Sequence, residues 1–238
     1  MWLLYDLAFL ILTILSLPRL LSRAWRRTLS ERLGRLPPSL SDSSLSRLWL
    51  HAVSVGEVLA QRPLLERIRL EFQKHQLVLS TTTLTGREVL ERIRRPGEVA
   101  FYFPFDIRLI SRRVLRQIRP SLFVTMETEL WPNLLLELRR RKIPAVVANG
   151  RISDRSFRSY LAIRRLLSPA LEGIRLFCMQ SEEDARRLRS LGVSEKKIRV
   201  TGNLKFDAVT FQAPLDPPAL RRRLGLRENG KNQKRKII

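Results

Sequence analysis

Apolar runs of strand length alternate with amphipathic runs of helix length along most of this 238-residue chain. We predict helices between the strands, over residues 57–74, 85–95, 107–118, 132–141, 154–172 and 181–191. The strands are predicted near residues 47–53, 76–80, 98–103, 121–126, 143–149, 174–179 and 197–202. Such alternation is typical of right-handed β-α-β units. The predicted fold class is therefore α/β, with a mostly parallel sheet and helices on both of its faces.

Polar residues gather directly after six of the predicted strands. In chain order these groups are Ser54, Gly56 and Glu57; Thr82, Thr83, Thr85, Gly86 and Arg87; Glu127, Glu129 and Trp131; Asn149, Arg151 and Ser153; Ser181; and Asn203 and Lys205. The carboxyl ends of parallel strands meet at one edge of a sheet, and α/β proteins bind their ligands at that edge. We therefore expect these residues to line one polar crevice, which is the candidate active site.

Three acids at this edge are candidates for chemistry. Glu57 follows Gly56 at a strand-to-helix turn, where it can serve as a general base or can complement the helix dipole. Glu127 and Glu129 can bind a metal, stabilise a cation or cap the helix that Pro132 begins. The sequence has no Asp-Xaa-Asp, His-Xaa-His or cysteine cluster that would support a metal site. We expect His51, within a strand pattern, to be a core histidine with satisfied nitrogens.

Two further segments suit an anionic or hydroxylated ligand. The run from Thr81 to Arg87 places hydroxyls, backbone donors and one guanidinium at a helix start, which suits phosphate or sugar hydroxyls. This run is not a Walker loop, because the Gly-Lys-Ser/Thr ending is absent. Lys205 follows the last predicted strand and can neutralise a leaving phosphate.

The net charge of the chain limits the chemical classes of partner that it can bind. There are 45 lysines and arginines against 22 acids, a formal net charge of +23. An excess of this size predicts an anionic partner, which can be nucleic acid, an anionic membrane or an acidic substrate. Aromatic residues make up only 7%, and no base-stacking motif is visible. A nucleic-acid-binding domain therefore stays an alternative, while an anionic membrane fits better.

The N-terminal segment favours a membrane over nucleic acid as the anionic partner. Residues 1–17 are almost entirely apolar, and arginines follow directly, at positions 19, 23, 26 and 27. Positive charge stays on the cytoplasmic side, so we predict an uncleaved anchor helix over residues 1–22 and a cytoplasmic-facing body at the inner membrane. Residues 23–46, rich in Arg, Ser and Pro, are predicted to be a basic juxtamembrane linker. The α/β domain is predicted over residues 47–210.

Six motifs together resemble the 3-deoxy-D-manno-octulosonic acid (Kdo) transferases of lipopolysaccharide synthesis. The resemblance runs from the N-terminal segment to about Leu226. It is carried by His51-Ala-Val-Ser-Val-Gly-Glu57, Ser80-Thr-Thr-Thr-Leu-Thr-Gly-Arg87, Tyr102-Phe-Pro-Phe-Asp106, Met126-Glu-Thr-Glu-Leu-Trp-Pro-Asn133, Asn149-Gly-Arg-Ile-Ser153 and Thr201-Gly-Asn-Leu-Lys-Phe-Asp207.

The resemblance implies a GT-B glycosyltransferase, in which two Rossmann-like domains face a cleft. It implies transfer of Kdo from CMP-Kdo to a tetraacylated lipid A precursor, lipid IVA, with no metal or other cofactor and no nucleic acid partner. Glu57 would be the general base that deprotonates the acceptor hydroxyl. Glu127 and Lys205 would stabilise the transition state. The remaining polar residues listed above would bind substrate.

The C-terminal segment departs from the family pattern. Members of the family continue into a second domain that holds most of the CMP-Kdo contacts. We expect residues 211–238 to be an interdomain linker and the start of such a domain, so the sequence resembles a truncated member or a fragment. A non-catalytic, membrane-bound module that binds anionic lipid is therefore a second alternative.

Overall fold

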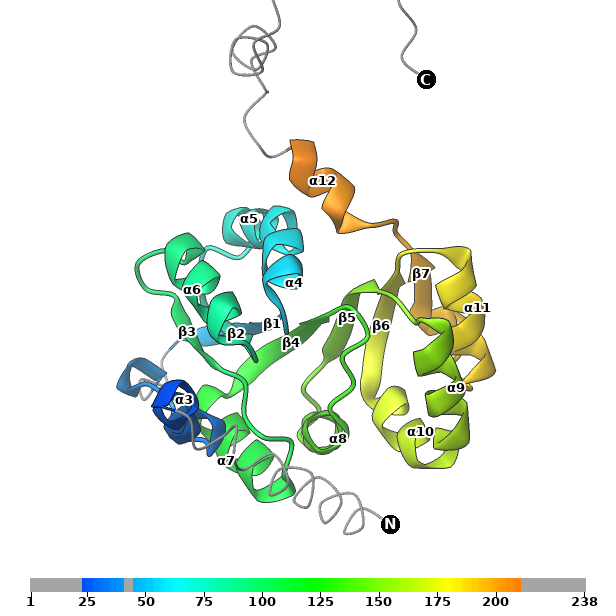
Figure 1. The fold of residues 1–238 in the computed structure, drawn as a ribbon, viewed down its shortest axis with the longest axis horizontal. Coiled ribbons are helices and arrows are strands. Elements are labelled where there is room, and N and C mark those ends of the chain that lie inside the picture. Colours follow the sequence, from blue (N-terminus) through cyan, green and yellow to red (C-terminus); the bar gives the residue numbers. More distant parts are fainter. Residues whose placement is uncertain (1–22, 41–44, 211–238) are drawn as a thin grey trace, which may run out of the picture.

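Seven parallel strands form a single sheet in the computed structural model, which describes residues 23–40 and 45–210 (Figure 1). The strands lie in the order β3-β2-β1-β4-β5-β6-β7. Their bounds are β1 (Ser46–His51), β2 (His75–Thr81), β3 (Val99–Tyr102), β4 (Pro120–Met126), β5 (Ala145–Gly150), β6 (Ile174–Met179) and β7 (Ile198–Val200). All seven predicted strands are present, which confirms a Rossmann-like α/β fold.

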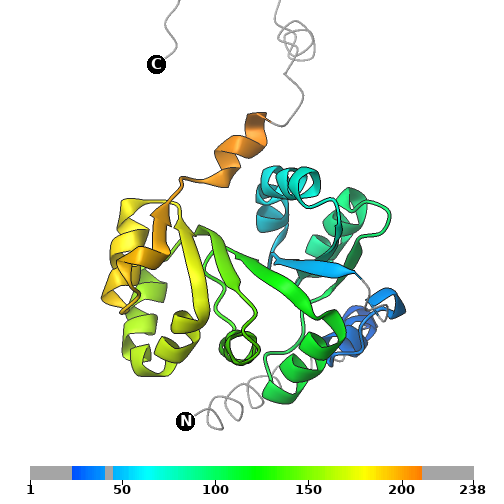
Figure 2. The ribbon, with the colours of Figure 1, turned by 180° about the vertical axis from the view of Figure 1, so that it is seen from behind.

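Helices cover both faces of the sheet (Figures 1 and 2). One face is covered by α4 (Val55–Ala60), α5 (Arg62–Glu71) and α6 (Leu84–Ile93). The other is covered by α7 (Arg108–Ile118), α8 (Pro132–Arg140), α9 (Asp154–Ala162), α10 (Arg164–Gly173) and α11 (Glu182–Ser190). The short helix α12 (Leu204–Thr210) follows β7 and contacts α4 and α5. Two 3-10 turns complete the fold, η1 (Pro38–Leu40) and η2 (Glu195–Lys197).

A hydrophobic core fills the space on each side of the sheet, because side chains alternate between the faces along each strand. On β1, Trp49 belongs to the larger core, whereas Leu48 and Leu50 belong to the smaller one. Trp49 is fully buried, and its ring centroid lies 4.8 Å from that of Phe123. Its indole nitrogen donates a 2.8 Å hydrogen bond to Ser80 Oγ. The central strands are therefore fixed from both faces.

Two predicted helices are each divided in the structure. The segment predicted as one helix over 57–74 forms α4 and α5, which meet at Gln61. Pro63 lies in the first turn of α5, where its ring cannot continue a preceding helix but suits a new one. The segment predicted over 154–172 forms α9 and α10, which meet at Ile163.

The segment predicted as a linker begins with a packed helix, α3 (Arg23–Arg32). Arg32 is only 4% exposed. Its Nε donates to Thr28 Oγ1 at 3.0 Å, and its Nη2 donates to the carbonyl of Thr82. Burial lowers the pKa of Arg32 to about 10, so the side chain stays charged at neutral pH. The linker prediction is wrong for this part of the chain, because contacts distant in sequence dock α3 on the domain.

The predicted anchor, residues 1–22, lies outside the described residues, as do residues 211–238. Within residues 23–40 and 45–210, no helix combines the length and the apolar character needed to cross a bilayer.

Candidate active site

The three candidate acids follow the two strands at the centre of the sheet. β1 and β4 are neighbours there, and the strand order reverses between them. In open α/β sheets, ligands bind outside the carboxyl ends of the strands at a reversal of this kind. Glu57 lies just after β1, and Glu127 and Glu129 lie just after β4. The prediction that these segments converge on one edge of the sheet is confirmed.

Glu57 caps the helix that carries it. The Ser54 hydroxyl accepts a 3.4 Å hydrogen bond from the Glu57 backbone N–H. In return, the Glu57 carboxylate accepts 2.9 Å hydrogen bonds from the Ser54 hydroxyl and the Val53 backbone N–H. This reciprocal pattern resembles a capping box, with the carboxylate reaching the backbone N–H one residue before the N-cap Ser54. It holds the carboxylate in one orientation beyond the end of β1 and leaves each oxygen a further lone pair.

The surroundings of Glu57 suit proton transfer. The residue is 6% exposed, and burial raises the pKa of its carboxyl above the ordinary value of 4.5. The hydrogen bonds from Val53 and Ser54 oppose this shift, and the nearby Glu127 adds to it. A general base works best when its pKa approaches the operating pH. The capping role and the base role are therefore compatible.

The turn after β4 holds the other two acids. Glu127 has a φ of 52°, in the left-handed region, and its N–H donates to the Ala148 carbonyl at 2.9 Å. Burial first, and then the charges of Glu57 and Glu127, raise the pKa of Glu129 to about 7. Glu129 can therefore gain or lose a proton near neutral pH.

Lys205 is placed beside these acids by two asparagines. Asn149 Oδ1 accepts from the Leu204 N–H at 3.0 Å, and Asn203 Oδ1 accepts from the Lys205 N–H at 3.0 Å. These bonds fix the first turn of α12. Lys205 Nζ then lies 3.7 Å from Glu127 Oε1 and is half exposed. Residues 149, 203 and 205, distant in sequence, are thus parts of one arrangement, as the crevice prediction requires.

Three threonines at and just after the end of β2 tie two strand-end loops together. The hydroxyls of Thr81, Thr82 and Thr83 donate to the Val53 carbonyl at 2.9, 3.0 and 3.3 Å. Thr83 also caps α6 by accepting from the Gly86 N–H at 3.0 Å. A Cβ at position 86 would lie 2.4 Å from Thr81 Oγ1, so the close packing requires glycine there. These residues tie β2 to the loop that precedes Glu57.

Arg87 and Thr85, two other predicted ligand residues, lie on α6 and differ in their surroundings. Arg87 forms ion pairs with Glu31 at 3.0 Å and Glu91 at 2.8 Å, and its guanidinium lies over the Tyr102 ring. It is therefore engaged with α3 and α6. Thr85 is exposed in the first turn of α6.

Gly56 and Arg151 are exposed. A Cβ at position 56 would meet nothing closer than Ser54 Oγ at 3.8 Å, and φ there is not positive. Nothing within the described domain therefore requires glycine at position 56, which leaves room for the approach of a ligand. Arg151 follows β5, and its backbone N–H donates to Thr128 Oγ1 at 3.0 Å, which ties the turn after β4 to the turn after β5.

The remaining predicted ligand residues have structural partners. Ser153 and Ser181 cap α9 and α11 by accepting from the backbone N–H groups of Ser156 and Asp184. Trp131 immediately precedes α8. Its ring centroid lies 4.8 Å from that of Phe103.

His51 is a core residue, but only one of its nitrogens is satisfied. Its Nδ1 lies 3.0 Å from Ser80 Oγ, and its ring stacks on Phe103 at 3.8 Å. Burial lowers the pKa of His51 to about 3, so the ring is neutral. Nε2 is buried and has no hydrogen-bond partner among the residues that the structure describes. The expectation of a fully satisfied histidine is wrong on this point.

Two residues that support the site were not predicted as site residues, although Asp106 ends one of the six motifs of the family resemblance. Asp106 accepts from the backbone N–H groups of Asn133 and Leu134 at 3.0 and 2.9 Å, so a distant segment caps α8. The Tyr160 hydroxyl donates to the Thr128 carbonyl at 3.3 Å, and burial together with Glu129 raises the pKa of Tyr160. Neither residue carries a local signal, because the partners lie 27 to 32 residues away.

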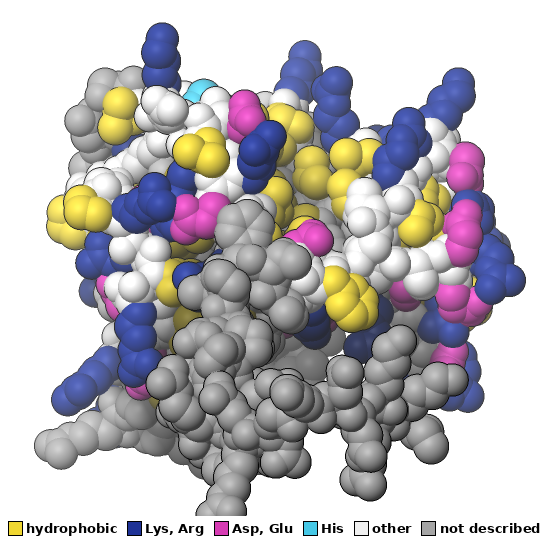
Figure 3. All heavy atoms as spheres, turned by 90° about the horizontal axis from the view of Figure 1, so that it is seen from above, with side chains coloured by type: hydrophobic (Ala, Val, Ile, Leu, Met, Phe, Trp, Pro, Cys, Tyr) yellow, Lys and Arg dark blue, Asp and Glu magenta, His cyan; other side chains and the backbone are white. Residues whose placement is uncertain are grey.

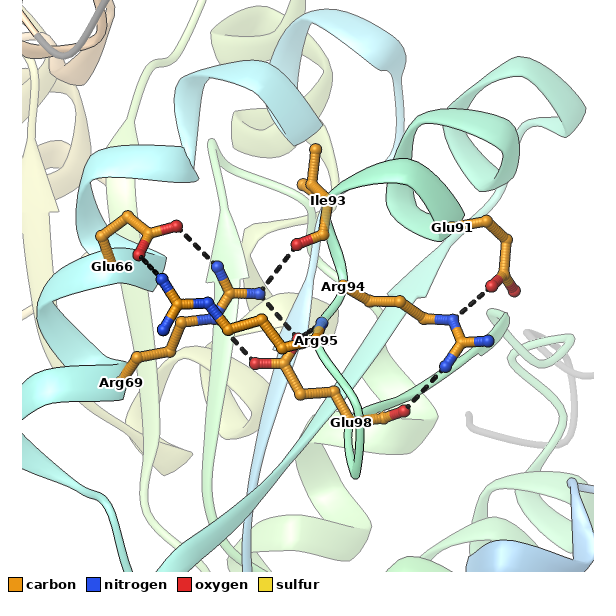
Figure 4. A network of polar contacts seen from close by, with 7 residues as sticks. All are labelled: Glu66, Arg69, Glu91, Ile93, Arg94, Arg95 and Glu98. Carbon is orange, nitrogen blue, oxygen red and sulfur yellow. Dashed lines mark hydrogen bonds and ion pairs between the residues drawn. The ribbon is translucent and has the colours of Figure 1, made fainter.

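A cavity of about 420 Å³ lies at the amino ends of the strands, near the start of β2. Two of its lining arginines are already neutralised (Figure 4): Arg69 by Glu66 and Glu98, and Arg95 by Glu66. The Arg69–Glu98 pair is nearly buried and ties α5 to the loop before β3. This cavity is therefore bordered by a structural ion-pair network and is remote from the acids at the carboxyl edge.

Comparison with known proteins identifies relatives of this chain. Residues 27–208 match the family described as 3-deoxy-D-manno-octulosonic-acid transferase (kdotransferase). The 3-deoxy-D-manno-octulosonic acid transferase of Haemophilus influenzae is 34% identical over 201 residues, which cover 84% of this chain and 47% of that protein. A bifunctional glycosyltransferase/methyltransferase of Fusobacterium nucleatum is 36% identical over 180 residues, which cover 75% of this chain and 28% of that protein. The chain thus spans about half the length, or less, of these relatives.

Solved structures share the fold. A UDP-N-acetylglucosamine 2-epimerase from Listeria monocytogenes, described as putative, superposes with a TM-score of 0.56 at 13% sequence identity. The match covers 75% of this chain and 51% of that one. At this identity the likeness concerns the fold, and it agrees with the Rossmann-like arrangement of the sheet.

Proposed function

The chain belongs to the 3-deoxy-D-manno-octulosonic-acid (Kdo) transferase family, and we propose that it binds the lipid acceptor and supplies the base for Kdo transfer. The acceptor would be a lipid A precursor, lipid IVA, and the donor CMP-Kdo. The reaction would take place at the cytoplasmic face of the inner membrane. It would use no metal ion or other cofactor and no nucleic acid.

The observation that carries the proposal is the meeting of three carboxylates and one lysine at the strand-order reversal. The charge of Glu127 helps to raise the pKa of Glu57, the charges of Glu57 and Glu127 help to raise the pKa of Glu129, and Lys205 pairs with Glu127. Glu57 would accept the proton of the acceptor hydroxyl while the hydroxyl oxygen attacks the anomeric carbon of Kdo. The bond from that carbon to the phosphate oxygen of CMP would break, and CMP would leave with the bonding electrons.

The other charged groups fit the course of this reaction. A transition state with oxocarbenium character is positive at the sugar and is stabilised by nearby carboxylates, here Glu127 and Glu129. Negative charge develops on the departing phosphate, and an ammonium group such as that of Lys205 can stabilise it. The excess of arginine over the whole chain suits a phosphorylated lipid at an anionic membrane. On the face drawn in Figure 3, basic side chains project around much of the outline.

The test is Kdo transfer by a chimera in which this chain replaces the matching part of the Haemophilus influenzae relative. Product formation from CMP-Kdo and lipid IVA is measured by mass spectrometry. In the chimera, Glu57→Gln keeps the shape and the capping ability of the side chain but cannot take a proton. We expect the rate to fall about 10²- to 10⁴-fold, with the unfolding midpoint unchanged.

Glu66→Gln is the matched control, because Glu66 lies on α5 in the remote ion-pair network. It should transfer Kdo at the parental rate. A Glu57→Gln chimera within a few-fold of the parent would remove Glu57 from the chemistry and leave it a helix cap. Failure of the isolated chain to bind lipid IVA would contradict the acceptor-binding role.

A further inference from the structure

Arg32, the last residue of α3, is a buried arginine that directs its charge at the backbone near the site. Both of its hydrogen bonds go to uncharged oxygens, Thr28 Oγ1 on its own helix and the carbonyl of Thr82. The guanidinium also lies 4.4 Å from the ring centroid of Trp25 and 5.3 Å from that of Tyr102. Hydrogen bonds from a charged donor are stronger than those between neutral groups. Arg32 therefore fixes the position of the chain just after β2.

Thr82 extends this contact to the segment that precedes Glu57. The backbone N–H and the hydroxyl of Thr82 both donate to the Val53 carbonyl, at 3.4 and 3.0 Å. The Val53 N–H in turn donates a 2.9 Å hydrogen bond to the Glu57 carboxylate. A continuous series of contacts thus joins α3 to the candidate base, from Arg32 through Thr82 and Val53.

The end of α3 is itself held firmly beside β3 (Figure 1). The Glu31 carboxylate accepts hydrogen bonds from the Tyr102 N–H at 2.6 Å and from Arg87 at 3.0 Å. The Arg32 carbonyl accepts a 3.0 Å hydrogen bond from the Phe105 N–H. Because these contacts come from β3, α6 and the loop after β3, the Arg32 side chain starts from a fixed point. It can therefore define where the Thr82 carbonyl lies.

We propose that Arg32 is a positioning residue for Glu57: by holding the Thr82 carbonyl, it keeps the Val53 segment where its N–H bonds the carboxylate of the base. The inference deepens the proposed function, and it rests on that function only for the role of Glu57 as the base. It assigns a part in the site to a helix that lies outside the strand-end loops.

The sign of the effect follows from the Val53 hydrogen bond. This bond favours the ionised carboxylate and lowers the pKa of Glu57, so its loss should raise that pKa. The other charged side chains around Glu57 come from different elements, Glu127 and Glu129 from the turn after β4 and Lys205 from α12. They are unchanged in the variants below.

The test is a carboxyl carbon NMR titration of Glu57 in the full chain. Arg32→Met keeps the length and the apolar packing of the side chain but cannot donate to Thr82. The midpoint of Glu57 should rise by about one pH unit, because a hydrogen bond to a charged group changes its ionisation constant about tenfold. Thr28→Val is the matched control: it removes the other acceptor of Arg32, at a position only 1% exposed. It should lower the free energy of unfolding and leave the Glu57 midpoint unchanged.

A second substitution tests the path of the effect. Thr82→Val removes the hydroxyl that bonds the Val53 carbonyl and leaves the backbone acceptor of Arg32 in place. It should raise the Glu57 midpoint by itself, which tests the series of contacts even if Arg32→Met does not fold. Substitutions that act through one route are not additive. The double variant Arg32→Met/Thr82→Val should therefore shift the midpoint no further than the larger single shift, whereas a direct effect of the Arg32 charge would add in full.

The chimera supplies a catalytic readout. Below both Glu57 midpoints, Arg32→Met should transfer Kdo about tenfold more slowly than the parent, because the ionised fraction of the base is about tenfold smaller. Above both midpoints the difference should narrow, since the base is then ionised in both proteins. A purely structural defect would lower the rate by the same factor at every pH.

Three results would overturn the proposal: an unchanged Glu57 midpoint in Arg32→Met, the same rise in Thr28→Val, or full additivity in the double variant. The titration contains no substrate, so it is independent of Kdo transfer. A raised midpoint with an unchanged dependence of the transfer rate on pH would support the positioning by Arg32 and contradict the role of Glu57 as the base.

Discussion

Replacing Glu129 with glutamine should stabilise the fold in a pH-dependent way. The pKa of the Glu129 carboxyl is about 7 in the folded chain, against an ordinary value of 4.5. The folded chain therefore holds this proton more tightly than the unfolded chain. Below about pH 4.5 both states are protonated and the group costs no stability. As the pH rises from there through about 7, the folded state must either keep a proton from solution or bear an unfavourable charge, so stability falls.

The size of the effect follows from the shift. One pKa unit corresponds to about 1.4 kcal/mol, so the shift from 4.5 to about 7 corresponds to about 3.5 kcal/mol. The carboxylate is only partly shielded from solvent, which reduces this to about 2 to 3 kcal/mol. The glutamine of Glu129→Gln is neutral at every pH. Its free energy of unfolding should match the parent near pH 4.5 and exceed it by about 2 to 3 kcal/mol above pH 8.

Urea denaturation of the parent and the variant at about pH 5 and pH 8 measures the difference. Glu88→Gln is the matched control, because Glu88 is an exposed carboxylate on α6, and it should change stability by less than about 0.5 kcal/mol at either pH. Since the charge of Glu57 contributes to the shift, Glu57→Gln should also lower the Glu129 midpoint in a carboxyl carbon NMR titration. If the difference in free energy of unfolding between Glu129→Gln and the parent were the same at both pH values, the reasoning would be refuted.

Substitutions at two further positions test ligand approach at Gly56 and the capping of α8 by Asp106. Gly56→Ala should raise the free energy of unfolding by up to about 1 kcal/mol, because alanine favours helix and space is open around that position. In the chimera it should raise the KM for lipid acceptor, and an unchanged KM would show that no ligand approaches Gly56. Asp106→Ala should lower the unfolding free energy by about 1 to 2 kcal/mol, with Asp106→Asn between it and the parent, because α8 loses its cap. Equal stability of all three in urea would contradict that role.

The strands and their order along the chain could be predicted because each is a short apolar run followed by polar turn residues. The division of 57–74 into two helices was also signalled in principle, since Pro63 cannot lie inside a continuous helix. The division at Ile163 carried no such signal, because neither glycine nor proline lies at that point. Local patterns therefore predict the elements well but place some of their boundaries poorly.

The errors arose where distant contacts decide the structure. α3 has an arginine-rich sequence that suggests a solvated linker. Its docking depends on Arg32 reaching Thr82 and on Glu31 reaching Arg87, 50 and 56 residues away. Arg87 was expected at the ligand for the same reason, because its partners cannot be seen in its own segment. The acids of the crevice were predictable as a group, since the geometry of a parallel sheet brings strand ends together, but the raised pKa of Glu129 depends on burial that only the fold creates.

The backbone amide of Val53 donates a hydrogen bond to the Glu57 carboxylate. Its NMR signal can therefore report whether the candidate base is ionised. Protonation of Glu57 removes charge from the acceptor of that bond. The amide proton of Val53 would then move upfield and exchange faster with deuterium, while amides deeper in β1 would not change. The ionisation of Glu57 can thus be followed in the resting protein, one residue at a time and without any substrate, through an atom that takes no part in the chemistry.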